Sequence, residues 1–319
     1  MSDNTVLIAS RSFGKATPEV FDELRAAGCQ LLLNPHEQSP SEDDMITLVR
    51  DAEVIVSGTE ALTARVIAAA PRLRGIVKHG VGYENIDLGA ARAHSVPVCI
   101  AGGAITDSVA DMAFALLLAL ARKIPAGDRM VKSGGWGRVI GVELNEKLLG
   151  IVGLGQIGKA VCKRARGFGM RVMAFDAVRD EAFAAQHAVR YASLEDVFTH
   201  SDFITLHAPG GPATRNLIDA AALARMKASA FLINTARGEL VDEAALYQAL
   251  LTRRIAGAAS DVFVDEPPAG DHPLLSLDAF IAAPHSASQT LEGLRAMGQV
   301  TRDNVLRLLR GEAPLFRVT

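Results

Sequence analysis

Short apolar runs alternate along the chain with stretches whose apolar residues have helical spacing. In the first hundred residues these runs predict strands at 5–9, 54–57, 75–78 and 96–100. Thr17-Pro18-Glu19 has the order of an N-cap, a proline at the first helical position and an acid in the first turn, and Gly28 is placed to end that helix. The alternation of strands with helices indicates a small parallel α/β domain.

The rest of the chain repeats this alternation. Its apolar runs predict strands at 147–152, 171–175, 202–206, 230–234, 255–258 and 280–283. A stretch that is almost entirely apolar, Met112–Ala121, predicts a buried helix over 107–122, capped at Thr106 or Asp107. A leucine- and arginine-rich stretch over 291–309 predicts a last helix, which we expect to cross back and complete the first domain.

A glycine cluster, Gly153-Leu154-Gly155-Gln156-Ile157-Gly158, follows the predicted strand at 147–152. A helix predicted at 159–165 and a second strand come next, which is the context in which such a motif binds a dinucleotide. The first glycine permits a tight turn, the second lets the backbone approach the pyrophosphate, and the third lets the helix pack on the strand. The phosphates would lie at the helix N-terminus, where free N–H groups favour anions.

Asp176, at the end of the second strand, is placed to accept hydrogen bonds from the adenosine ribose hydroxyls, which favours NAD over NADP. Arg179 lies three residues further on, so use of NADP stays open. The chain has 28 glycines, and a bare match to the motif is therefore also compatible with a chance loop. The strands, helix and acid in register favour the dinucleotide site.

Bulk properties exclude several other classes of protein. A length of 319 residues suggests two domains, and a net charge of −3 provides no basic field for nucleic acid. Cys29, Cys99 and Cys162 form no CxxC pair, which argues against a metal site and indicates reduced thiols. Residues 1–4 lack the basic segment of a signal peptide, and the longest apolar run is too short to cross a bilayer. We therefore expect a cytoplasmic protein.

Side chains capable of catalysis or ligand binding follow three of the predicted strands. Arg237 follows the strand at 230–234, Glu266 lies in the loop after the next strand, and His285 follows the last one. Because the carboxyl ends of parallel strands meet at one edge, the three side chains should converge beside the cofactor. The alternatives are a core histidine, a surface arginine and a surface acid like the neighbouring Asp265.

At this point the sequence resembles the D-isomer-specific 2-hydroxyacid dehydrogenase family, and within it the D-3-phosphoglycerate dehydrogenase-like branch. The resemblance covers nearly the whole chain. Besides the glycine cluster it rests on segments 80–87, 108–111, 134–138, 206–209, 234–238, 261–267 and 284–285. It implies two doubly wound parallel-sheet α/β domains. A Rossmann NAD-binding domain, residues 101–287, would be inserted into a discontinuous flavodoxin-like substrate domain, residues 1–100 and 288–319. The family also implies a homodimer.

The resemblance implies hydride transfer between the nicotinamide of NAD and C2 of a small D-2-hydroxy acid. His285 would exchange the hydroxyl proton, Glu266 would hydrogen-bond the imidazole and fix its tautomer, and Arg237 would hold the substrate. The residues implied in cofactor binding are Gly153, Gly155, Gln156, Ile157, Gly158, Asp176, Ala208, Thr235, Ala236, Arg237, Asp261, His285 and Ala287. Those implied in substrate binding are Lys78, Val81, Gly82 and Arg237.

Three positions stay open on the residues alone. His79 flanks the substrate loop and has either a structural role or a contact with substrate. Trp136 and Arg138 either line the pocket or join the domains.

The sequence also departs from the family pattern. Ile105 stands where the family often has asparagine, and Asp111-Met112 replaces the usual Glu-His. The arginine that phosphoglycerate dehydrogenases place near Ser57 to bind the substrate phosphate is missing, which leaves Lys78 and Arg138 as anion contacts.

Two other functions stay open. The first is a glyoxylate or hydroxypyruvate reductase, which the missing phosphate arginine favours. The second is a non-catalytic NAD-sensing, co-repressor-like protein, against which the intact set of Arg237, Glu266 and His285 argues.

Overall fold

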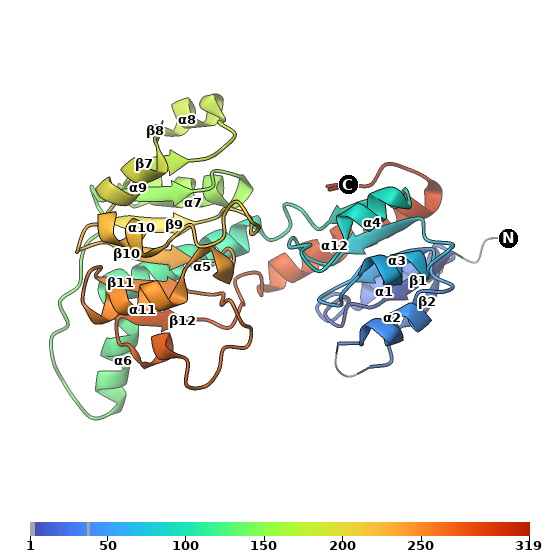
Figure 1. Cartoon of the computed structure of the whole chain (residues 1–319), viewed down its shortest axis with the longest axis horizontal. Helices are drawn as coiled ribbons and strands as arrows, with labels where there is room; N and C mark the ends of the chain where they lie inside the picture. Colours follow the sequence, from blue (N-terminus) through green and yellow to red (C-terminus); the bar gives the residue numbers. More distant parts are fainter. Residues whose placement is uncertain (1–3, 37–38) are drawn as a thin grey trace. The chain divides into compact units, whose positions relative to one another are not determined.

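The structure is a computed structural model that describes residues 4–36 and 39–319. The chain forms two compact units, one of residues up to Ile105 with Thr290–Thr319, the other of Thr106–Gln289 (Figure 1). The chain passes from one unit to the other after Ile105 and after Gln289, a few residues beyond the predicted boundaries at 100/101 and 287/288. Residues 1–3, most of the segment on which the lack of a signal peptide was predicted, lie outside the described residues.

The described part of the first unit forms a five-stranded parallel sheet in the order β2-β1-β3-β4-β5. Its strands are β1 (Thr5–Ile8), β2 (Gln30–Leu33), β3 (Val54–Ser57), β4 (Gly75–Lys78) and β5 (Val98–Ile100). Its helices are α1 (Glu19–Ala26), α2 (Glu42–Leu48), α3 (Ala64–Ala68), α4 (Leu88–Ala93) and α12 (Leu291–Arg310). This strand order is flavodoxin-like. As expected, α12 returns to this unit, where it packs against α1, β3 and β4.

The start of α1 differs from the prediction. The helix begins at Glu19 with Pro18 at the N-cap and no side-chain cap, so Thr17 is not the capping residue. Thr17 is instead buried, and its hydroxyl faces Gly298 of α12, where a Cβ would come within 2.4 Å of Oγ1. The helix end was predicted correctly, because Gly28 follows it with a φ of +85°.

The second unit, all of whose residues are described, contains a seven-stranded parallel sheet in the order β12-β11-β10-β9-β6-β7-β8. Its strands are β6 (Leu148–Val152), β7 (Arg171–Phe175), β8 (Val189–Tyr191), β9 (Phe203–Leu206), β10 (Phe231–Asn234), β11 (Gly257–Ser260) and β12 (Phe280–Ala282). The strand order reverses between β6 and β9, as in the Rossmann fold, and this reversal is where such folds bind a dinucleotide.

Helices cover both faces of this sheet. They are α5 (Thr106–Arg122), α6 (Ile124–Lys132), α7 (Gln156–Gly167), α8 (Glu181–His187), α9 (Leu194–His200), α10 (Ala220–Arg225) and α11 (Glu243–Leu251), with short 3₁₀ turns η1 (Gly238–Leu240) and η2 (Pro273–Ser276). The predicted apolar helix is α5, which packs against α7, β10 and β11. It starts at Thr106, so the predicted cap at Thr106 or Asp107 is wrong: both residues lie in the first turn.

Two other boundaries were misplaced. The strand predicted at 255–258 is β11, two residues later, and α7 begins inside the glycine cluster, three residues earlier than predicted.

Asp111, which departs from the family pattern, has a partner in the structure: it accepts a hydrogen bond from Arg164 of α7 at 2.7 Å, and Asp107 accepts one from the same guanidinium at 3.1 Å.

The three cysteines are free and buried. Burial raises the pKa of the Cys99 thiol to about 12 and that of Cys162 to about 11, so both are held as neutral thiols. Among the described residues, no helix combines the length and apolarity needed to cross a membrane.

Candidate active site

The three glycines of the cluster differ in what surrounds them. Gly153 has a φ of +95°, and a Cβ there would lie 2.7 Å from the backbone nitrogen of Ala208. A Cβ on Gly158 would lie 2.1 Å from the carbonyl oxygen of Gly153. At Gly155 a Cβ would meet nothing within 4 Å. The first and third glycines are therefore required by the fold, whereas the second borders open space.

The amino end of α7 faces that space with its backbone donors. Gly155 is the N-cap residue, and no side chain caps the helix. Asp176 lies at the end of β7, beside the loop: its Oδ2 accepts from the Leu154 N–H at 2.6 Å and its Oδ1 from the Val178 N–H at 2.9 Å. A carboxylate has about four lone-pair positions, so it can still accept ribose hydroxyls.

Thr235, directly after β10, supplies a further polar group. Its hydroxyl is fully enclosed and has no hydrogen-bond partner among the described residues. A buried hydroxyl without a hydrogen-bond partner is unfavourable unless a ligand supplies that hydrogen bond. The glycine loop, the uncapped helix and this hydroxyl all lie at the carboxyl edge of the sheet, and together they fit NAD.

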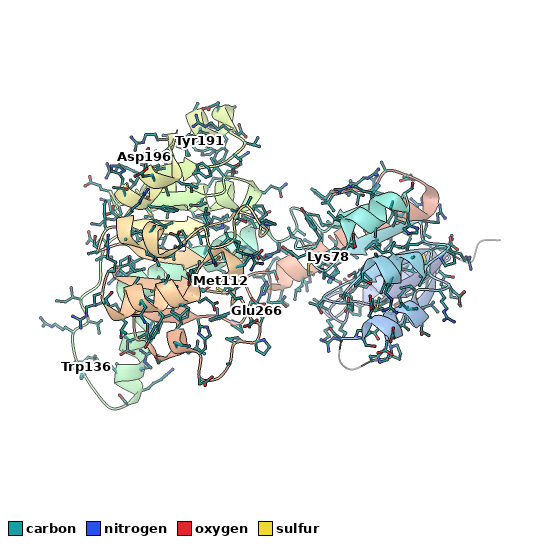
Figure 2. All side chains as sticks on the ribbon, viewed as in Figure 1. Lys78, Met112, Trp136, Tyr191, Asp196 and Glu266 are labelled. Carbon is teal, nitrogen blue, oxygen red and sulfur yellow. The ribbon has the colours of Figure 1, made fainter. Side chains whose placement is uncertain are left out.

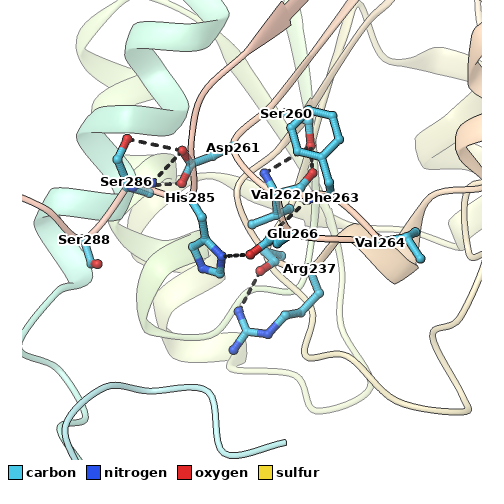
Figure 3. A network of polar contacts seen from close by, with 12 residues as sticks. Arg237, Ser260, Asp261, Val262, Phe263, Val264, Glu266, His285, Ser286 and Ser288 are labelled. Carbon is cyan, nitrogen blue, oxygen red and sulfur yellow. Dashed lines mark hydrogen bonds and ion pairs between the residues drawn. The ribbon is translucent and has the colours of Figure 1, made fainter. Parts of the chain in front are cut away.

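His285 and Glu266 form the central polar pair of the site. The imidazole Nδ1 lies 2.6 Å from Glu266 Oε2, and Glu266 Oε1 accepts from the Phe263 N–H at 3.0 Å (Figure 3). Because a carboxylate only accepts, the proton of the neutral ring belongs on Nδ1, and Nε2 is left as the free acceptor. The His285 side chain is 51% exposed, so it is not a core histidine.

The loop that carries His285 is held by Asp261. This carboxylate, 1% exposed, accepts the N–H groups of Ser286 at 2.9 Å and Ala287 at 2.8 Å. The His285 N–H donates to the Asp261 carbonyl at 2.7 Å, and His285 itself has a φ of +50°, in the left-handed region. Both oxygens of Asp261 therefore position the loop that carries His285. The cofactor contact predicted for Asp261 stays a prediction.

Arg237 lies in the loop after β10, beside Glu266 and His285 (Figure 3). Asn234 fixes this loop: its amide donates to the Arg237 carbonyl at 2.8 Å and accepts from the Ala236 N–H at 3.0 Å. At Gly238 a Cβ would lie 2.0 Å from the carbonyl carbon of Phe263. The loops that carry Arg237 and Glu266 are therefore packed against each other. No role was predicted for Asn234 from the sequence, although a polar residue at the end of an apolar strand is a usable signal.

The substrate-binding candidates Lys78, Val81 and Gly82 belong to the first unit. Lys78 is buried, and its ammonium donates to the Gly58 carbonyl and, at 2.8 Å, to Asn85 Oδ1. The N–H groups of Val81 and Gly82 have no acceptor within the part of the chain that the structure describes.

His79 has a structural environment. It is buried, its Nδ1 lies 3.0 Å from Thr301 Oγ1, and its ring meets the edge of Phe13. Burial, with a smaller contribution from Lys78, lowers the pKa of His79 to about 4, so the ring is neutral in the core of the first unit.

The fold and the site define an NAD-binding oxidoreductase. A family model described as D-isomer specific 2-hydroxyacid dehydrogenase, NAD binding domain, matches residues 114–287. The chain belongs to the D-isomer specific 2-hydroxyacid dehydrogenase family.

Two curated relatives show how the sequence compares. A glyoxylate reductase from Korarchaeum cryptofilum is 41% identical over 285 residues, covering 87% of this chain and 86% of that protein. A D-3-phosphoglycerate dehydrogenase from Methanocaldococcus jannaschii is 40% identical over 277 residues, and the match covers 85% of this chain but 52% of that protein. A crystal structure of a Thermus thermophilus protein is similar with a TM-score of 0.90 at 33% identity, covering 99% of this chain and 100% of that one.

The different surroundings of the glycines lead to a test. We expect Gly155→Ala to change the free energy of unfolding by no more than about 1 kcal/mol, because the added Cβ meets no protein atom. The same methyl group occupies the approach to the helix N-terminus, so the Kd for NADH should rise at least about tenfold. Gly158→Ala is the matched control and should cost about 2 kcal/mol or more of stability. Unchanged NADH binding by Gly155→Ala would contradict this phosphate site.

Proposed function

We propose that this enzyme interconverts a small 2-oxo acid and its D-2-hydroxy acid, with Arg237, Glu266 and His285 as the catalytic residues. The observation that carries the proposal is the 2.6 Å pair of His285 and Glu266, which leaves Nε2 of an exposed ring available beside Arg237. Bound NAD supplies the hydride acceptor in oxidation and, as NADH, the hydride donor in reduction.

His285 moves the proton. In reduction its imidazolium donates from Nε2 to the 2-oxo oxygen, and in oxidation neutral Nε2 accepts the hydroxyl proton. Glu266 holds the ring orientation through Nδ1, and its negative charge stabilises the imidazolium. The hydrogen bond from the Phe263 N–H fixes the carboxylate in turn.

Arg237 binds the substrate. Its planar guanidinium matches a carboxylate with two parallel hydrogen bonds and also stabilises charge that develops on the 2-oxo oxygen. The backbone N–H groups of Val81 and Gly82 fit the carboxylate end of the same class of substrate, since both lack a protein acceptor among the described residues.

Replacing the proton-transfer residue tests this assignment. We expect His285→Gln to lower kcat by about 10²–10⁴-fold, because the general acid is lost, while the Kd for NADH stays close to that of the unaltered enzyme. Glu266→Gln should lower kcat less, because the imidazole remains but loses its charged partner at Nδ1. His94→Gln, at the end of α4, is the matched control. Retained turnover in His285→Gln would overturn the role of this residue.

We propose that the substrate is unphosphorylated, of the glyoxylate or hydroxypyruvate class. Two observations support this. The ammonium of Lys78 already donates to the Gly58 carbonyl and to Asn85 Oδ1. In addition, the stretch around buried Ser57 lacks the arginine that would bind a substrate phosphate. Arg138, the other anion contact named from the sequence, is exposed on the loop after α6.

An initial-rate panel decides between the substrates. With NADH, kcat/KM should be at least about tenfold higher for glyoxylate or hydroxypyruvate than for 3-phosphohydroxypyruvate, since one well-placed charged contact is worth about that factor. The reverse order would assign a phosphoglycerate dehydrogenase. Tight NADH binding without turnover of any 2-oxo acid would revive the NAD-sensing alternative.

We further propose a homodimer formed through the segment that begins at α6. Here several apolar side chains face solvent in the single chain: Ile124, Val131, Trp136 and Ile140. Trp136 is 91% exposed and Ile140 is 84% exposed, and Figure 2 shows Trp136 on the loop that leaves α6. Exposed apolar groups gathered along one segment are typical of a subunit interface.

Trp136 is the only tryptophan of the chain, so its fluorescence reports on this interface directly. We expect light scattering to give a dimer and the emission to shift to the red when the dimer is diluted into monomers. Trp136→Asp with Ile140→Asp should yield a monomer, whereas Leu251→Asp, at an exposed position of α11, should not. A monomer at every concentration would refute the dimer.

We also place the enzyme in the cytoplasm. Its three thiols are free and buried, which suits a reducing compartment. Fractionation of source cells tests this, and recovery outside the cytoplasmic fraction would contradict it.

A further inference from the structure

A strongly basic hollow of about 670 Å³ lies at the amino edge of the seven-stranded sheet, opposite the edge that carries the catalytic residues. Five of its lining residues have basic side chains: Arg166, Arg171, Arg190, His200 and Lys227. None of the residues that line it is acidic.

The register of the sheet explains why these groups gather. β7 and β8 pair in parallel, with Met173 opposite Arg190. Arg171 precedes Met173 by two residues, so Arg171 and Arg190 lie on the same face of the sheet. The Arg190 guanidinium reaches the Met173 sulfur at 3.8 Å, as this placement requires.

Helices bring in two further groups. His200 is the last residue of α9, which packs against β6 and β7, and Arg166 lies in the last turn of α7. Four separate elements of the second unit therefore contribute to one hollow.

The positive charge of the hollow is largely uncompensated. Within the described residues, no carboxylate pairs with Arg166, Arg171 or Arg190. Arg171 donates only to the Glu146 carbonyl, at 3.2 Å. Two of the other basic groups lie near a carboxylate: Lys227 pairs with Asp202 at 2.8 Å, and the His200 Nδ1 lies 3.9 Å from an oxygen of Asp196. The Asp196 carboxylate also interacts electrostatically with Arg190, although the two form no ion pair.

Other arginines of the protein show the contrast. Arg164, two residues before Arg166 on the same helix, holds two carboxylates, and Arg302 also holds two. The end of a helix favours a cation, which accounts for Arg166 but not for the arginines on the strands. In a chain of net charge −3, three guanidinium groups that line one hollow, none of them in an ion pair with a carboxylate, repel one another, and a bound anion would relieve this repulsion.

We propose that this hollow is a second ligand site, which binds a small anion with more than one phosphate group. Guanidinium groups bind phosphate oxygens through two parallel hydrogen bonds, and several arginines around one hollow match several charged groups of one ligand. The site is separate from the NAD site. β7 runs from Arg171 at the hollow to Phe175, next to Asp176 at the glycine loop, and five residue steps of strand span roughly 16 Å. Both sites can be filled at once.

Calorimetry with inorganic pyrophosphate tests the proposal, on protein saturated with NADH so that the glycine loop is occupied. We expect one pyrophosphate per chain and weaker binding of orthophosphate. Arg166→Gln with Arg190→Gln should weaken pyrophosphate binding at least tenfold. Arg190→Glu, which places a carboxylate in the hollow, should abolish it.

The matched control removes two arginines that do not line the hollow, by Arg225→Gln with Arg253→Gln. It should bind pyrophosphate as the unaltered protein does, and all variants should keep their thermal midpoint and NADH affinity. No pyrophosphate binding by the NADH-saturated protein would overturn the proposal. Equal loss of binding in the control variant, or unchanged binding in Arg166→Gln with Arg190→Gln, would also overturn it.

Discussion

The edge of the sheet that carries Arg237, Glu266 and His285 depends on one buried carboxylate. Asp261 ends β11 and is almost fully enclosed, so its charge is tolerated only because both oxygens accept backbone N–H groups, from Ser286 and Ala287. Those two bonds, with the bond from the His285 N–H to the Asp261 carbonyl, hold His285 in a left-handed conformation that a non-glycine residue rarely adopts. In that conformation the ring Nδ1 lies 2.6 Å from Glu266 Oε2. The geometry of the His285–Glu266 pair is thus determined by Asp261, which directly follows the neighbouring strand β11.

The NAD site is built differently, mainly from the backbone. Gly153 and Gly158 bring the loop, Ala208 and α7 into contact, and Gly155 leaves the amino end of the helix open. Few side chains are needed, because helix N–H groups already favour a phosphate. The side chains predicted to contribute, Asp176 and Thr235, stand directly after strands whose positions the sheet fixes. The same parallel sheet therefore positions both the glycine loop and the loops that carry Arg237, Glu266 and His285.

Much of this arrangement was predictable from the sequence, because buried strands are apolar and follow one another with helices between them. β2 was not predicted, since its residues are mostly half-exposed and carry no alternation, and β8 has only three residues. The caps predicted at Thr17 and at Thr106 or Asp107 were wrong. Thr17 is instead buried, with its hydroxyl against Gly298 of α12, a packing contact that the local sequence does not reveal. The grouping of an arginine, a carboxylate and a histidine followed from strand order, and the family resemblance selected Glu266 rather than Asp265 as the carboxylate. The anchoring by Asp261 and Asn234 did not, since a side-chain bond to a distant backbone group leaves no pattern in the sequence.

The position of α12 has a consequence for the order in which the protein is made. Gly75 of β4 lies against Leu308 so closely that a Cβ would come within 2.5 Å of that side chain, and Val305 is fully buried in the same core. Val305 and Leu308 are translated only after the whole second unit, long after β3 and β4 have left the ribosome. The second unit is continuous in sequence and can fold as it emerges, whereas the first presents an uncovered sheet face until α12 arrives. During synthesis, the first unit to start is therefore the last to be completed.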